Sequence, residues 1–172
     1  GRVPLSDCAG EIVALGSKAK KWDEGKKVIS CCYPNWISGA PEPNLLSFIG
    51  DNQDGYATEY IAISEDSITE MPEKWTFKEA ATLPCAALTA WHALIDRGGL
   101  KSGQTVLTLG TGGVSIFALQ LAKSMGAQVI ATSSSNNKCL KLKEIGADEV
   151  INYSEHKQWG KEVLKLTNGK GV

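Results

Sequence analysis

The sequence has little of what membrane proteins, nucleic-acid-binding proteins and secreted proteins require. It contains no apolar run long enough to span a bilayer. Its 18 basic and 19 acidic residues give a net charge of −1. The chain therefore lacks the excess of positive charge that nucleic-acid-binding proteins have. The first residues, Gly1 to Pro4, do not resemble a signal peptide. We therefore expect a cytoplasmic protein with no membrane partner and no nucleic-acid partner.

Cysteine and histidine are too few and too scattered for a zinc ribbon or a disulfide framework. The five cysteines are an odd number and lack C-x-x-C spacing, which suits a reducing compartment better than a set of disulfides. The two histidines, His92 and His156, lack the partners expected of a catalytic histidine. We interpret His92 as a core residue and His156 as a surface residue.

A glycine-rich stretch between Thr105 and Thr132 is the most informative part of the chain. A short apolar run precedes its glycines, and apolar residues then recur at helical spacing. This pattern predicts a strand, a glycine turn, a helix and a second strand. The turn reads Gly110-x-Gly112-x-x-Ser115, which differs from the dinucleotide fingerprint G-x-G-x-x-G only at its third place. A small serine is tolerable there, because that place serves helix-to-strand packing.

A glycine turn before a helix is suited to binding a pyrophosphate group. Glycine lets backbone N–H groups approach the ligand without a Cβ in the way, and the helix N-terminus supplies unpaired donors and a positive dipole end. We therefore predict a dinucleotide site here, in preference to a purely structural turn. The expected cofactor-binding residues of the turn are Gly110, Thr111, Gly112, Gly113, Val114 and Ser115.

The end of the second predicted strand indicates which dinucleotide binds. An acidic residue there would accept hydrogen bonds from the ribose and repel a 2′-phosphate. Instead, the chain has Ser133, Ser134 and Ser135, then two asparagines and Lys138, with no acid nearby. Hydroxyls and an ammonium group suit a dianionic phosphate, so we predict NADP(H) in preference to NAD(H). The serines also suit the N-cap of the next helix, and the same turn can both cap the helix and bind a phosphate.

The composition of the chain changes near Cys85, where we place a domain boundary. Turn-rich β structure is expected before it, and alternating helices and strands after it. The predicted strands are 3–14, 28–33, 56–63 and 150–151, and the predicted helices are 76–80, 86–97, 137–145 and 161–166. Helix 86–97 is apolar nearly all round and is expected to be buried between layers. Because a doubly wound sheet of three strands lacks its second half, we expect a fragment.

Short motifs along nearly the whole chain carry a family resemblance. They are Ala9-Gly10-Glu11-Ile12-Val13 with Leu15-Gly16, Gly25-Lys26-Lys27-Val28, Gly55 to Tyr60, Ala80 to Cys85, Thr89-Ala90-Trp91, Gly126-Ala127 and Ile145-Gly146-Ala147-Asp148. In this order they resemble the medium-chain dehydrogenase/reductase superfamily, which includes zinc alcohol dehydrogenases and quinone oxidoreductases. The resemblance implies an α/β protein. Residues 1–85 would be the later part of a chaperonin-10-like β-barrel catalytic domain, and 86–172 the N-terminal part of a Rossmann doubly wound parallel sheet.

The resemblance also bears on the cofactor and on zinc. Lys138 and Tyr153 match a lysine and a tyrosine that lie at the adenosine phosphate in relatives that use NADPH, although Tyr153 alone also suits a strand-end aromatic. Zinc alcohol dehydrogenases have a histidine ligand before the Ala-Gly pair, whereas this chain has Ser6, a poor zinc ligand. Cys85 matches a later cysteine ligand, but a lone thiol is more often a small buried hydrophobe. We therefore expect no metal ligands and no zinc.

The resemblance implies an oxidoreductase that transfers hydride between NADP(H) and a small carbonyl or alcohol, a quinone or an activated alkene. It places Ser6 and Thr89 near the nicotinamide, where they would donate to developing negative charge, and Asp7 would orient a neighbour. The alternatives are a zinc-dependent alcohol dehydrogenase and a non-catalytic dinucleotide-binding or inactive truncated product. The expected partners are a small-molecule substrate and, for the full-length protein, a second copy in a homodimer.

Overall fold

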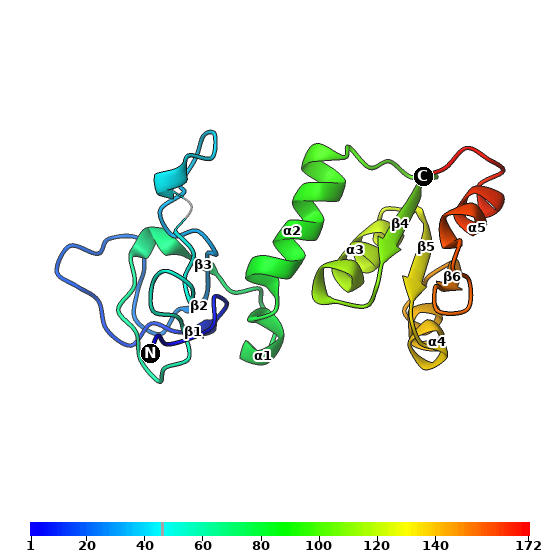
Figure 1. Ribbon diagram of the computed structural model, residues 1–172. Coiled ribbons are helices and arrows are strands. Elements are labelled where there is room, and N and C mark those ends of the chain that lie inside the picture. Colours follow the sequence, from blue (N-terminus) through cyan, green and yellow to red (C-terminus); the bar gives the residue numbers. More distant parts are fainter. Residues whose placement is uncertain (46) are drawn as a thin grey trace. The chain divides into compact units, whose positions relative to one another are not determined.

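The computed structural model describes residues 1–45 and 47–172, and Figure 1 labels its main elements. The chain divides into two compact units, 1–85 and 86–172. The elements up to the division are β1 (Ala9–Glu11), β2 (Lys27–Ser30), η1 (Pro43–Leu45), η2 (Glu65–Ser67), β3 (Ile68–Glu70) and α1 (Phe77–Ala80), and η3 (Leu83–Ala87) crosses it. Then follow α2 (Leu88–Trp91), η4 (His92–Arg97), β4 (Thr105–Leu109), α3 (Gly113–Ser124), β5 (Gln128–Ser133), α4 (Asn136–Glu144), β6 (Glu149–Asn152) and α5 (Trp159–Leu166). In the described residues, no helix is both long and apolar enough to cross a membrane.

The first unit is built on a small antiparallel sheet in the order β1-β2-β3. Ile29 of β2 packs with Met71 and Ala80 in its core. The predicted capping box of α1 is confirmed. The Thr76 side chain accepts a hydrogen bond from the Glu79 backbone, and the Glu79 carboxylate accepts one from Thr76 N at 2.9 Å.

The prediction of a strand over 56–63 is wrong. These residues have no strand structure, and Tyr60 is 76% exposed. Backbone hydrogen bonds tie the start of the segment to residues 3–5: Gly55 N donates to Val3 O at 2.7 Å, Tyr56 N to Leu5 O at 2.9 Å and Ala57 N to Pro4 O at 3.1 Å. A Cβ at Gly55 would lie 2.2 Å from Pro4 O, so this close approach requires glycine.

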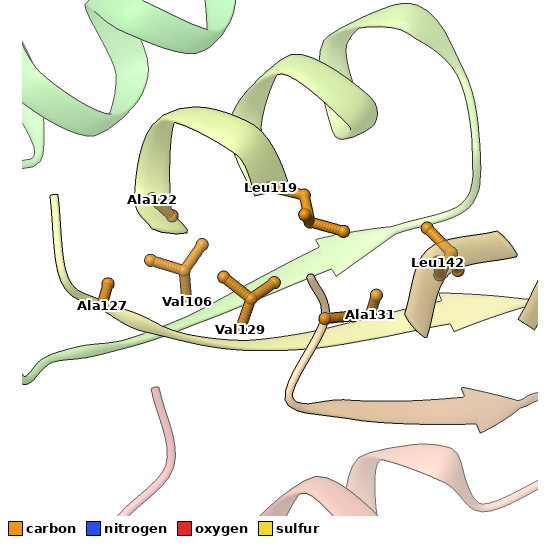
Figure 2. Packing of buried hydrophobic residues seen from close by; sticks show 8 residues of the cluster. Val106, Leu119, Ala122, Ala127, Val129, Ala131 and Leu142 are labelled. Carbon is orange, nitrogen blue, oxygen red and sulfur yellow. The ribbon is translucent and has the colours of Figure 1, made fainter. Parts of the chain in front are cut away.

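The second unit is a parallel sheet in the order β4-β5-β6, as the sequence predicts (Figure 1). Successive residues of β5 pack on opposite faces of this sheet. Val129 packs with Leu119 of α3 and Leu142 of α4 in the cluster shown in Figure 2. Ile130 packs with Val163 of α5 in a second cluster. Helices therefore cover both faces, which is the arrangement of a doubly wound fold.

The predicted helix over 86–97 is helical but irregular. A single α-helical turn, α2, lies between two π-helical segments, η3 and η4. The burial expected of a helix that is apolar nearly all round is only partly present: Ala90 is buried, whereas several larger apolar side chains are not. Leu88 and Trp91 are exposed, and so is His92, which pairs with Asp96 at 3.2 Å. The interpretation of His92 as a core residue is therefore wrong.

Candidate functional site

The glycine turn connects the end of β4 to the start of α3. Gly110 has a φ of +81°, a conformation that glycine adopts without strain. Gly112 is the N-cap residue of α3, and no side chain among the described residues caps the helix there. A Cβ built at Gly110 or Gly112 would meet no atom within 4 Å, so open space adjoins the backbone at both positions.

Gly113 has a different role from the other two glycines of the turn. A Cβ at this position would lie 3.1 Å from the Cβ of Ala86, so Gly113 allows α3 to pack closely on the segment that precedes α2. The residues of the turn thus fit a dinucleotide. The space beside Gly110 and Gly112 accommodates a pyrophosphate, and the N-terminus of the 12-residue helix α3 provides backbone donors for it.

Two hydroxyl groups hold the turn in shape. Ser115 Oγ donates a hydrogen bond to Leu109 O at 2.8 Å and so closes the turn from inside the helix. Gly110 N donates to Thr132 Oγ1 at 3.2 Å and to Thr132 O at 3.1 Å. Thr132 is 2% exposed and pairs with Leu109 in the sheet. Sequence reasoning missed Thr132, although a hydroxyl residue ending the neighbouring strand is a signal for this contact.

The three parallel strands bring the predicted phosphate-binding residues to one edge of the sheet. Tyr153, directly after β6, donates its backbone N–H to Ser133 O at 2.9 Å. Lys138 and Ser134 are exposed and Ser135 is half-buried, whereas Ser133 is 2% exposed. The structure therefore brings Ser133, Ser134, Ser135, Lys138 and Tyr153 into neighbouring turns. Ser135 is the N-cap residue of α4, but its side chain makes no capping hydrogen bond to the described residues.

An acidic side chain lies beside this turn, contrary to what the sequence indicates. The acid is Glu155, which follows β6. Its Oε1 accepts hydrogen bonds from Asn136 Nδ2 at 2.6 Å and from Asn152 Nδ2 at 3.1 Å. Sequence reasoning missed both Asn152 and Glu155, because they reach the turn across neighbouring strands.

Ser6 and Asp7 lie together in the first unit. The Asp7 carboxylate accepts a hydrogen bond from Cys32 Sγ at 3.5 Å. Burial raises the pKa of Asp7, and the Cys32 and Ser6 side chains partly oppose that shift. Buried Ser30 fixes the segment, because its Oγ accepts from Cys8 N at 3.0 Å and donates to Ser6 O at 3.4 Å. Sequence reasoning missed Ser30.

Thiols and one phenol surround Asp7. Burial raises the pKa of Cys32, and the neighbouring Asp7 and Cys85 add to that shift. The hydroxyl of Tyr56 is buried without a hydrogen-bond partner in the described part of the chain, and burial raises its pKa to about 12. Within residues 1–45 and 47–172, no three His, Cys, Asp or Glu side chains are grouped to hold a metal ion. Thr89 is an exposed residue of α2 and belongs to the second unit.

Two family models match the chain. The model described as alcohol dehydrogenase GroES-like domain matches residues 2–73, and the model described as zinc-binding dehydrogenase matches residues 113–172. A zinc-type alcohol dehydrogenase-like protein of Schizosaccharomyces pombe is 41% identical over 172 residues, covering 98% of this chain and 50% of the relative. A 2-methylene-furan-3-one reductase of Solanum lycopersicum is 36% identical over 155 residues, covering 89% of this chain and 37% of the relative.

Solved structures agree with these matches. A protein of Sinorhizobium meliloti assigned to the alcohol dehydrogenases has a TM-score of 0.93 and 38% identity, covering 99% of this chain and 51% of that chain. An NAD-dependent alcohol dehydrogenase has a TM-score of 0.85 and 35% identity, covering 99% and 52%. The chain thus spans about half the length of the Schizosaccharomyces pombe relative and of these two solved structures. It belongs to the medium-chain dehydrogenase/reductase superfamily, with both zinc-type alcohol dehydrogenase-like and quinone oxidoreductase-like proteins among its relatives.

Proposed function

We propose that the full-length protein is an NADP(H)-dependent oxidoreductase. It reduces or oxidises a small carbonyl or alcohol, a quinone or an activated alkene, without a catalytic zinc ion. The observation that carries this proposal is the open glycine turn at the N-terminus of α3. In this reading, unit 1–85 is the later part of the chaperonin-10-like catalytic domain, and unit 86–172 begins the Rossmann domain.

The turn would hold the cofactor through its main chain. Backbone N–H groups from Gly112 to Val114 lie at the start of α3 and are directed toward a ligand there by the helix geometry. The Thr132 hydroxyl and the Ser115 hydroxyl keep that backbone in place through Gly110 and Leu109. When bound, the nicotinamide ring supplies or takes the hydride, and the chain provides position and charge.

The preference for NADP(H) rests on the turn between β5 and α4. Ser134, Ser135 and Lys138 are accessible there and offer hydroxyl and ammonium donors to a 2′-phosphate, and Tyr153 follows the neighbouring strand. Glu155 opposes this preference by its charge, but its Oε1 is already hydrogen bonded by two amide groups. One similar solved structure is named an NAD-dependent enzyme. The preference for NADP(H) over NAD(H) is therefore proposed from the hydrogen-bond donors of this chain and not from its relatives.

Ser6, Asp7 and Thr89 are the proposed catalytic residues. Ser6 or Thr89 would donate a hydrogen bond to the oxygen on which negative charge develops during reduction. Asp7 would orient the adjacent Ser6 side chain, which lowers the pKa of the Asp7 carboxyl. Ser6→Ala should therefore lower kcat by about tenfold or more with little change in NADPH affinity. Unchanged turnover would remove Ser6 from this role.

The experiment that tests the site uses Gly112→Ala in the full-length protein. The extended backbone of Gly112 suits alanine and the new methyl group meets no protein atom, so the fold should be retained. The methyl group would, however, occupy the space proposed for the pyrophosphate. We expect NADPH affinity, measured by calorimetry, to fall by about tenfold or more. Gly160→Ala is the matched control, because its Cβ also meets open space but lies in α5. A folded Gly112→Ala protein with unchanged affinity would refute the site.

A zinc-dependent alcohol dehydrogenase is the second candidate. The match to the family model described as zinc-binding dehydrogenase and the similarity to a zinc-type alcohol dehydrogenase-like protein support it. Zinc analysis of the purified protein separates the two candidates.

We also expect a homodimer in solution, which light scattering tests.

A further inference from the structure

We infer that Asn152 and Glu155 are positioning residues that shape the 2′-phosphate side of the proposed cofactor site. This inference rests on the proposed function. Neither residue lies in the turn itself: Asn152 ends β6 and Glu155 follows it, and both are hydrogen bonded to Asn136, the first residue of α4. Their proposed role is to hold the turn between β5 and α4 in the shape that presents its hydroxyl and ammonium donors.

Asn152 is the centre of the arrangement. It is 8% exposed, and its amide group is satisfied on both sides. Its Nδ2 donates to Asn136 Oδ1 at 2.6 Å and to Glu155 Oε1 at 3.1 Å, and its Oδ1 accepts from Ser154 N at 3.0 Å. A buried amide whose groups are all paired specifies one local conformation, because any displacement leaves a buried polar group unpaired.

Glu155 completes a closed triangle of side chains. The same Oε1 atom that accepts from Asn152 also accepts from Asn136 Nδ2 at 2.6 Å. Two further contacts tie the same turns together: Ser154 Oγ donates to Ser134 O at 3.0 Å, and Tyr153 N donates to Ser133 O at 2.9 Å. The turn that carries Ser134 and Ser135 is thus fixed from the β6 side.

Because of where this network lies, substitutions in it should affect binding of the 2′-phosphate more than binding of the pyrophosphate. The pyrophosphate site at Gly110 to Gly112 belongs to the turn after β4, whereas Asn152 supports the turn after β5. Loosening the second turn should weaken contacts with the 2′-phosphate more than contacts with the rest of the nucleotide. Because Asn152 is buried, it acts through the turn and not by touching the ligand.

The test compares 2′,5′-ADP with 5′-AMP, which lacks the 2′-phosphate, by calorimetry on the full-length protein. Asn152→Ala should weaken 2′,5′-ADP binding by about fivefold and 5′-AMP binding by less than about twofold. Glu155→Ala removes the acceptor of both amides but also a negative charge near the 2′-phosphate, so it should act in the same direction with a smaller effect than Asn152→Ala. Glu155→Gln keeps an oxygen acceptor for both amides and should restore the wild-type preference to within about threefold. Glu149→Ala, at the opposite end of β6, is the matched control.

A second measurement needs no nucleotide. Hydrogen exchange of the backbone amides of residues 133–138 should become faster in Asn152→Ala and in Glu155→Ala, but not in Glu149→Ala. Equal losses of both nucleotides, or unchanged affinities and exchange rates, would overturn the positioning role. If the wild-type protein binds neither nucleotide, the proposed function itself fails, and the exchange rates still decide whether the network holds the turn.

Discussion

Two buried threonines on neighbouring strands differ in what their hydroxyl groups contact. Thr108 of β4 is 4% exposed, and its Oγ1 has no hydrogen-bond partner in the described residues. Thr132 of β5 is equally buried, but its Oγ1 accepts a hydrogen bond from Gly110 N. Valine has nearly the same shape as threonine, so replacing each threonine in turn measures only the hydroxyl group.

Thr108→Val should stabilise the protein. The substitution removes a buried hydroxyl that has lost its hydration without gaining a partner, and valine favours strands. We expect a gain of about 1 kcal/mol in the free energy of unfolding, seen as a rise of about 2–4 °C in Tm by calorimetry. A lower Tm would indicate that the Thr108 hydroxyl is hydrogen bonded in solution.

Thr132→Val should act in the opposite direction. It removes the acceptor for Gly110 N and leaves that group only the backbone oxygen of Thr132. The expected loss of stability is about 1 kcal/mol. Because Gly110 is part of the proposed pyrophosphate turn, NADPH affinity should also fall, whereas in Thr108→Val it should not. Equal NADPH affinities in the two variants would contradict the role given to Thr132.

At the residue scale, the sequence predicts which residues are present in a turn but not which residues reach it from elsewhere. The serines and Lys138 are read directly from the turn after the strand. Asn152 and Glu155 are 16 and 19 residues from Asn136 in the sequence, and they become its neighbours only because β6 pairs with β5. The strand order decides this contact, and a local pattern contains no information about it.

At the scale of elements, Asp148 joins a helix to two strands of the second unit. It lies just before β6, and its carboxylate accepts hydrogen bonds from Lys123 Nζ of α3 at 2.8 Å and from Val129 N of β5 at 2.6 Å. The bond from Lys123 is the main reason that the pKa of Asp148 lies below its ordinary value, and the bond from Val129 adds to it. The Gly-Ala-Asp motif thus has a structural role in this chain.

Asp148→Ala should destabilise the protein by about 1–2 kcal/mol at pH 7, because it removes a charge-assisted and a backbone hydrogen bond at a partly exposed site. A carboxyl group whose pKa is lowered by folding stabilises the fold fully above its unfolded pKa, and this contribution is lost as the pH falls through the folded pKa. The deficit of the variant should therefore shrink below about pH 4. Urea unfolding at pH 7 and pH 3 measures it, with Glu149→Ala as a surface control. A deficit independent of pH would contradict the ionic contribution.

The regular elements of the second unit are predictable because apolar side chains repeat with the period of the element. The strands and helices from β4 to α5 follow this rule. The segment 56–63 does not, because its β-forming residues suggest a strand, while contacts of Gly55 and Tyr56 with residues 3–5 fix the backbone. Helix 86–97 forms as predicted but contains π-helical segments, which the apolar composition of the segment does not reveal.

At the scale of the whole molecule, metal content is the property that most separates the proposed function from its rival. By the family resemblance, Ser6 takes the place of a histidine ligand of the zinc enzymes, and it lies next to Asp7 in the chain. Cys32 donates its S–H to the Asp7 carboxylate, and burial raises the pKa of this thiol, which disfavours its thiolate form. Zinc binds the thiolate form of cysteine.

We therefore expect the full-length protein to contain far less than one zinc ion per chain and to keep its NADPH-dependent turnover after prolonged treatment with a chelator. Cys85→Ser sharpens the test. If Cys85 is only a packing residue, the variant should lose less than about 2 kcal/mol of stability and retain most of its turnover. If Cys85 is a zinc ligand, the wild-type protein should contain stoichiometric zinc, and the substitution should remove metal and turnover together. That second result would replace the metal-free mechanism with Lewis-acid activation of the substrate oxygen. The assignment of the glycine turn would be unaffected, because the turn is formed by the second unit alone.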